Sequence, residues 1–212
     1  MSSQSESNND EKVQLESEIQ AYELADEVSP PPKAPVLFYG SSSIRLWALL
    51  EDDFRGYPVL NRGFGGARLQ DCVRFFPRLV KPYSPSVIVL YAGDNDLVDG
   101  RSPRDMLNIL REFLGLVSSN LSSVPVAFIS IKPSPARLSY RKQIEETNRL
   151  VEEFASQQDK LTFLNVYDRM LGPQRSFLGK WFLDDGLHMN RTGYVIWRDV
   201  VAPYLSVCGK KT

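Results

Sequence analysis

The sequence predicts an α/β fold, a three-layer αβα sandwich built on a five-stranded parallel sheet with the flavodoxin-like strand order 2-1-3-4-5. Five short apolar runs, rich in β-branched and aromatic residues, are typical of buried strands. Longer stretches with helical periodicity separate them, and this alternation indicates a parallel sheet with helices on both faces. With 212 residues, 42% of them hydrophobic, the chain can bury the core of one such domain.

Two segments precede the predicted domain, which spans residues 35–212. Residues 1–11 are polar and acidic, so we expect a disordered tail. Residues 12–34 should form a short helix and a proline-rich connector. Apolar residues recur at helical spacing from Leu15 to Tyr22, and the prolines that follow end the helix.

Within the domain, the expected strands and helices alternate in order. The strands are predicted at residues 36–39, 57–61, 86–92, 124–131 and 161–166, and the helices at about 68–80, 104–119, 139–158 and after Asn190. Ligands of such sheets bind beyond the carboxyl ends of the strands. The functional loops should therefore begin at Gly40, Gly63, Gly93, Lys132 and Tyr167.

Composition and charge exclude several classes of function. The net charge is −1, and no tight basic cluster with interleaved aromatic residues indicates a nucleic-acid partner. No apolar run approaches the roughly 18 residues of a membrane span, and the first residues lack the basic and apolar regions of a signal peptide. Cys72 and Cys208 are expected to be free thiols. We therefore expect a cytoplasmic protein; the sequence specifies no oligomeric state.

The loop after the first strand reads Gly-Ser-Ser-Ser, from Gly40 to Ser43. A serine here would stand at the N-terminus of the next helix, where backbone N–H groups favour developing negative charge. That position suits a nucleophile whose attack creates an oxyanion. A helix cap or an exposed turn residue is the alternative interpretation.

The second and third loops offer hydrogen-bond donors. Gly63, Gly65 and Gly66 are crowded before a helix, where glycine lets the backbone approach a ligand closely. Asn95 follows the third strand, and its side-chain amide can donate to an oxyanion without carrying charge. Asp94 beside it is a possible metal ligand, but hard cations need several converging oxygens, so we expect no metal.

The last loop holds His188, the single histidine of the chain. Imidazole is the side chain whose ordinary pKa suits proton transfer near neutrality. Asp185 lies three residues earlier, close enough on a turn to accept from Nδ1 and leave Nε2 facing a serine. Four separate loops at one sheet edge thus supply a serine, a glycine N–H, an asparagine amide and an Asp-x-x-His pair, where this fold builds its sites.

The blocks YGSSSI, NRGFGG, GDND and DGLH carry a family resemblance. From about Pro35 to about Leu205 the chain resembles the SGNH hydrolase superfamily, the GDSL-like esterases and acylhydrolases. The resemblance implies Ser42 as the nucleophile, with Ser41 in place of the family's usual aspartate. It also implies that His188 is the base, that Asp185 orients it, and that neither a metal nor an organic cofactor is needed.

The resemblance further implies an oxyanion hole. Its donors would be the N–H groups of Ser42 and Gly66 and the side-chain amide of Asn95. Gly65, one residue away from Gly66, is the alternative for the glycine position.

Substrate choice is predicted from weaker signals. Arg45, Arg68 and Arg137 lie near the functional loops and are candidates for binding phosphate or carboxylate, with ordinary ion pairs as the alternative. Since no large insertion could act as a lid, we expect a small soluble ester with a short acyl group, such as an acetyl ester of a carbohydrate. A lysophospholipase or thioesterase, a non-catalytic binding protein and a flavodoxin-like FMN binder are the alternatives.

Overall fold

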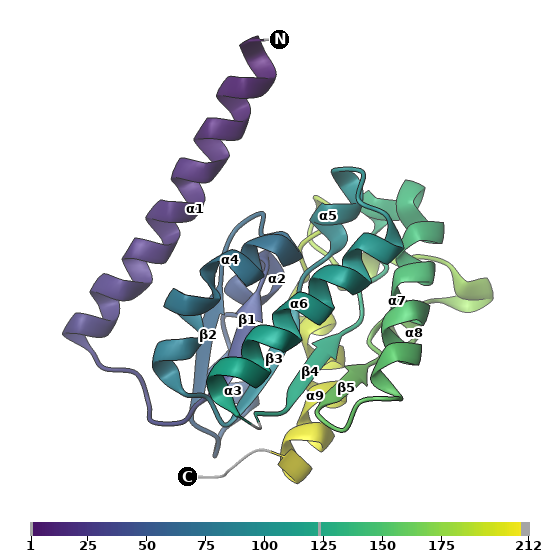
Figure 1. The fold of residues 1–212 in the computed structure, drawn as a ribbon. Coiled ribbons are helices and arrows are strands. Elements are labelled where there is room, and N and C mark those ends of the chain that lie inside the picture. Colours follow the sequence, from purple (N-terminus) through teal and green to yellow (C-terminus); the bar gives the residue numbers. More distant parts are fainter. Residues whose placement is uncertain (1, 123, 209–212) are drawn as a thin grey trace.

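The sheet is five-stranded and parallel, in the order β2-β1-β3-β4-β5, as predicted. The computed structural model describes residues 2–122 and 124–208, with side chains from residue 13 onward. The strands are β1 (Val36–Gly40), β2 (Val59–Gly63), β3 (Val87–Tyr91), β4 (Val126–Ile129) and β5 (Leu161–Leu164). Figure 1 shows them as the central layer of the molecule.

Helices cover both faces of the sheet (Figure 1). The described elements are α1 (Ser2–Val28), α2 (Ser42–Arg45), α3 (Leu50–Asp53), α4 (Leu69–Leu79), α5 (Asp94–Val98), α6 (Pro103–Leu121), α7 (Arg141–Ala155), α8 (Tyr167–Met170) and α9 (Arg191–Cys208), with short 3₁₀ turns at Lys81–Tyr83, Pro135–Tyr140, Pro173–Arg175 and Gly179–Trp181. None of the helices described here is long and apolar enough to cross a membrane.

Alternate side chains of each strand enter two separate hydrophobic cores. In β1, Leu37 and Tyr39 pack under α4 and α6, whereas Val36 and Phe38 pack against α3 and α9. All four side chains are fully buried, because a parallel sheet with helices on both faces leaves no solvent-facing side. The central strands therefore fix the positions of the loops that follow them.

The loops after β1, β2 and β3 start at the same level of the sheet. Gly40 is paired in register with both Gly63 and Tyr91. Gly40 has a φ of +130°, and a Cβ there would lie 1.9 Å from the carbonyl oxygen of Tyr91. Only glycine fits this position, and the tight turn that it permits carries the chain directly into the serine loop.

Helix α1 begins at Ser2, earlier than the boundary near residue 12 that the sequence predicts. No glycine or proline interrupts residues 2–28, so nothing in that stretch forces the helical backbone to end. Within the described side chains, the helix is anchored to the body by the buried Leu15 and Ile19 and by ion pairs that Glu16 and Glu23 form with Arg78 of α4. The structure includes residues 2–11 in α1, and the disorder of residues 1–11 in solution stays a prediction.

Candidate active site

Only the middle serine of the loop after β1 reaches the open site. Ser41 and Ser43 are buried, whereas Ser42 is half-buried. The Ser41 amide donates to the Tyr91 carbonyl (2.9 Å), and the Ser43 carbonyl accepts from the Tyr194 hydroxyl (3.0 Å). Ser41 precedes α2, but its side chain makes no capping hydrogen bond. The flanking serines thus shape and pack the turn, and the turn presents Ser42 to the site.

Ser42, His188 and Asp185 form a continuous chain of contacts. Ser42 Oγ lies 3.1 Å from His188 Nε2, and His188 Nδ1 lies 2.6 Å from Asp185 Oδ2. A carboxylate can only accept at Nδ1, so Nε2 is left with the lone pair that can take the hydroxyl proton. The two residues from the last loop therefore meet the serine from the first, 146 positions earlier.

The loop itself holds the carboxylate of Asp185 in place. Its Oδ1 accepts hydrogen bonds from the amides of Leu187 (2.8 Å) and His188 (2.9 Å). Burial acts to raise the pKa of Asp185, but these amide hydrogen bonds and the imidazole outweigh it and lower the pKa to about 2. The carboxylate is therefore ionised at neutral pH. Asp184 is exposed, and no described contact joins it to His188.

The two candidate glycines differ in what their amides do. The Gly65 amide donates to Glu18 Oε2 of α1 at 2.8 Å. In the described part of the chain, the Gly66 amide has no such protein acceptor, and Gly66 adopts a φ of +63° that favours glycine. The geometry therefore favours Gly66 over Gly65 as the oxyanion donor.

Asn95 stands at the start of α5 and is half-buried. Its Nδ2 donates to the Ala67 carbonyl at 3.2 Å, and its Oδ1 accepts from Arg137 Nη2 at 3.3 Å. Each amide nitrogen carries two protons, so one proton of Nδ2 remains for a ligand.

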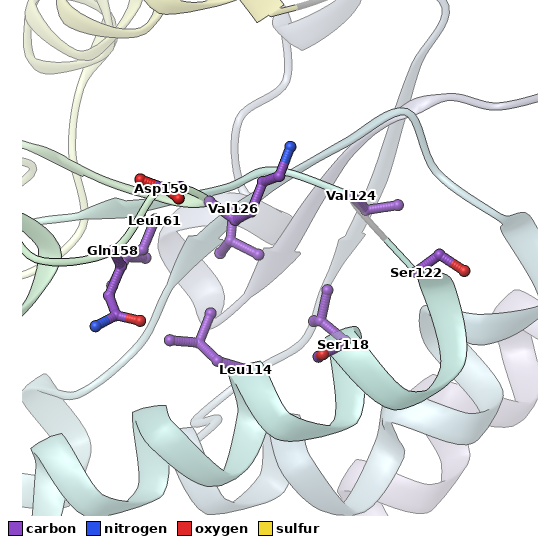
Figure 2. Close-up of a pocket in the computed structure, with 10 residues that line it drawn as sticks. Leu114, Ser118, Ser122, Val124, Val126, Gln158, Asp159 and Leu161 are labelled. Carbon is purple, nitrogen blue, oxygen red and sulfur yellow. The ribbon is translucent and has the colours of Figure 1, made fainter.

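Ser42 and His188 line one pocket of about 250 Å³ together with the two glycines and Asn95. Its lining consists of Gln14, Leu15, Ser42, Arg45, Gly65, Gly66, Asn95, Leu187 and His188. A second hollow, of about 320 Å³, lies between α6 and the ends of β4 and β5 (Figure 2). Its lining includes Leu114, Val126 and Asp159 but none of the candidate catalytic residues, so the first pocket is the candidate active site.

The three candidate arginines have different surroundings. Arg45 lines the pocket, and its Nε lies 3.7 Å from Glu18 Oε2. Arg68 is ion-paired with Asp99 and Asp71 and does not line the pocket, which matches the alternative interpretation given for it. Arg137 contacts Asn95 and is half-buried.

The structure adds supporting residues that the sequence did not predict. Lys132 Nζ lies 3.0 Å from both Asp94 Oδ2 and the Tyr91 hydroxyl, in a buried cluster that includes the residue preceding Asn95. Burial acts to raise the pKa of Asp94, yet the Lys132 charge and hydrogen bond lower it. Among the described residues, no group of three or more side chains is arranged to bind a metal.

Comparison with known protein families assigns the chain to one of them. A family model described as GDSL-like Lipase/Acylhydrolase matches residues 33–196, more than half of the chain. The chain belongs to this family. Membership supports a hydrolase that acts on esters, within the SGNH superfamily that the motifs indicate. A search of curated protein sequences finds no matching relative.

Solved structures share the fold of this GDSL-like protein at low sequence identity. A protein from Streptococcus pneumonia named for platelet activating factor is 22% identical, with a TM-score of 0.82 and coverage of 93% of this chain and 95% of that one. A GDSL-like lipase from Bacteroides thetaiotaomicron is 21% identical, with a TM-score of 0.76 and coverage of 89% and 97%. An acetyl esterase variant with a bound acetate ion is 16% identical, with a TM-score of 0.66 and coverage of 81% and 96%. At these identities the likeness establishes the fold alone.

Proposed function

We propose that the protein is a serine esterase that cleaves a short-acyl carboxylic ester through an acyl-enzyme on Ser42. The observation that carries the proposal is the contact chain from Ser42 Oγ to His188 Nε2 (3.1 Å) and from His188 Nδ1 to Asp185 (2.6 Å). This geometry is what a nucleophile, its base and the orienting carboxylate require.

In the first half of the reaction, Ser42 Oγ attacks the ester carbonyl carbon while its proton moves to His188 Nε2. The carbonyl oxygen becomes an oxyanion, held by the N–H groups of Ser42 and Gly66 and by Nδ2 of Asn95. The ionised Asp185 stabilises the imidazolium. When the tetrahedral intermediate collapses, the bond to the leaving oxygen breaks, and Nε2 returns its proton to the departing alcohol.

In the second half, water attacks the acyl group on Ser42. His188 Nε2 accepts a proton from that water, and the same donors hold the second oxyanion. Nε2 then returns the proton to Ser42 Oγ as the carboxylic acid leaves. Every proton-transfer and oxyanion-binding role falls on this chain's own groups, so the proposal needs no cofactor.

Pocket size supports a short acyl group. About 250 Å³ is small for a ligand site, and the apolar side chains of Leu15 and Leu187 take part of its wall. The acetyl esterase with the same fold and a bound acetate ion is consistent with an acetyl ester as the substrate, and we propose an ester of a carbohydrate or other small soluble molecule. A lysophospholipase or thioesterase activity is the alternative, and Arg45 at the pocket wall would suit an anionic group of such a substrate.

The deciding experiment is hydrolysis of p-nitrophenyl acetate, butyrate and octanoate by the wild type, Ser42→Ala and His188→Ala. We expect turnover that favours acetate and falls by at least about 10³-fold in both variants, because these residues act as a unit. Ser206→Ala, on the exposed side of α9, is the matched control and should leave the rate unchanged.

Equal rates for the wild type and Ser42→Ala would contradict the proposal and favour a non-catalytic binding protein. A yellow protein with flavin absorbance would favour an FMN binder. If the protein cleaves the octanoate ester faster than the acetate ester and still requires Ser42, the lysophospholipase or thioesterase alternative is favoured.

A further inference from the structure

The side-chain amide of Asn95 is held between two groups of opposite hydrogen-bonding character. On one side, Arg137 Nη2 donates to Oδ1 across 3.3 Å. On the other side, Nδ2 donates to the Ala67 carbonyl across 3.2 Å. Arginine has donors only, and a carbonyl oxygen is an acceptor only.

These two neighbours determine which way the amide faces. If the amide turned by 180°, its NH₂ would meet the guanidinium N–H groups, and its oxygen would meet the Ala67 carbonyl. Both contacts would then be repulsive. The observed orientation keeps nitrogen on the side of Ala67, in the loop that also holds Gly66, so the second Nδ2 proton is available to the pocket.

Among the described residues, the Arg137 side chain forms its hydrogen bond with Asn95 alone, and its charge also helps to lower the pKa of Asp94. No described carboxylate lies within 4 Å of its guanidinium, and its buried Nε has no hydrogen-bond partner there. The backbone fixes its position instead: the Arg137 amide donates to Ser134 at 2.8 Å. The amide of the preceding Ala136 donates to Gly186 at 3.1 Å, in the loop between Asp185 and His188.

We propose that Arg137 is a positioning residue that turns the Asn95 amide so that its nitrogen faces the ester oxyanion. The inference rests on the proposed esterase function. In this inference Arg137 affects the reaction by orienting Asn95, without contacting the substrate. Arg137 also joins two parts of the site, since the amide of the adjacent Ala136 donates to Gly186 in the loop of His188, and the Arg137 side chain contacts Asn95.

The test is a double-mutant cycle on p-nitrophenyl acetate with Arg137→Met, Asn95→Ala and the double variant. Methionine keeps much of the aliphatic volume but cannot donate. Asn95→Ala should lower kcat by about 10²-fold or more, as loss of one oxyanion donor does. Arg137→Met should lower kcat by about tenfold, with KM within about twofold, since it can lose at most what the amide contributes. The double variant should be no slower than Asn95→Ala.

Two further variants keep the test decisive. Arg137→Lys retains a charged donor and should recover part of the loss, and it replaces Arg137→Met in the cycle if that variant does not fold by circular dichroism. Arg149→Met removes an arginine from the exposed face of α7 and should match the wild type.

Each other outcome overturns the inference. Additive losses in the double variant would mean that Arg137 acts independently of Asn95. A raised KM with unchanged kcat would make Arg137 a substrate-binding group. If Ser42→Ala abolishes turnover but Arg137→Met equals the wild type, the positioning role fails while the esterase proposal stands. If the wild type shows no Ser42-dependent turnover, the esterase proposal fails and the inference falls with it.

Discussion

Asp96 should make the folded protein less stable as the pH rises through the acidic range. Its carboxylate is fully buried; Oδ2 accepts from the Leu69 amide at the start of α4 (2.8 Å), and Oδ1 has no hydrogen-bond partner among the described residues. Arg101 Nε is the nearest cation, at 3.7 Å from Oδ1. Burial raises the pKa of Asp96 from 3.8 to about 6, against the opposing effects of the Leu69 amide and Arg101, while Asp71 adds to the rise.

The sign and size of the effect follow from this shift. Below pH 3.8 the carboxyl is protonated in both the folded and unfolded chains. As the pH rises towards 6, the unfolded chain ionises first, so the folded state loses stability until Asp96 also ionises. A rise of about two pKa units corresponds to about 3 kcal/mol of the free energy of unfolding. That loss should be complete near pH 7 and constant above it.

Asp96→Asn removes this titration but keeps an oxygen for the Leu69 amide. We would measure urea unfolding of both proteins at pH 4, 5, 6, 7 and 8, by fluorescence of the buried Trp47 and Trp197. Comparing the two proteins cancels titrating groups that they share. The free energy of unfolding of the wild type relative to Asp96→Asn should fall by about 2 kcal/mol between pH 4 and pH 7, because the unfolded chain is already partly ionised at pH 4. A difference that stays constant, or that rises, would refute the reasoning.

Three further predictions concern other parts of the site. Lys132→Met should lower the free energy of unfolding, measured by urea titration, by about 3–5 kcal/mol, because it leaves the Asp94 carboxylate buried without its cation. The double variant Lys132→Met/Asp94→Asn should recover part of that loss. Asp185→Asn should lower kcat by about 10⁴-fold through the wrong imidazole tautomer. Since the pKa of Asp185 is lowered to about 2, its ionisation is lost only as the pH falls through that value, and the wild-type rate between pH 4 and 6 should show no step from this group. Leu15→Ala should raise the ratio of octanoate to acetate kcat/KM by about tenfold by opening the pocket wall; an unchanged ratio would mean that Leu15 does not limit the acyl group.

The strands were predictable from the sequence because buried parallel strands leave apolar runs, and their order was predictable because alternating strands and helices with right-handed crossovers commonly adopt the order 2-1-3-4-5. The bounds of the edge strand were not. The pattern predicts 57–61, whereas β2 is Val59–Gly63, since hydropathy reports burial and the strand is defined by pairing with β1. Asn61 and Arg62 are polar, yet they belong to the strand. Asn61 donates to the Ile44 carbonyl (2.8 Å), and Arg62 is ion-paired with Asp26 of α1.

Contacts between candidate catalytic residues were predictable where a motif holds the residues close in sequence, as it does for Asp185 and His188. Lys132 was not, because lysine is almost never fully buried unless it is paired. Its partner Asp94 lies 38 residues earlier in the chain. A single sequence contains no signal that this lysine turns inward, since β4 ends before it and the loop could equally present it to solvent.

The choice between Gly65 and Gly66 for the proposed oxyanion hole depends on a contact that only the structure shows. The motif favours Gly66 and leaves Gly65 as the alternative, and what distinguishes them in the structure is Glu18 on α1, 47 residues before Gly65. Glu18 takes the Gly65 amide, and Arg45 lies 3.7 Å from the same carboxylate. A carboxylate this close to a developing oxyanion would oppose it, unless donors hold and offset its charge. The Gly65 amide and Arg45 supply those donors, so the contact that removes Gly65 from the oxyanion hole also moderates the charge that α1 brings to the pocket.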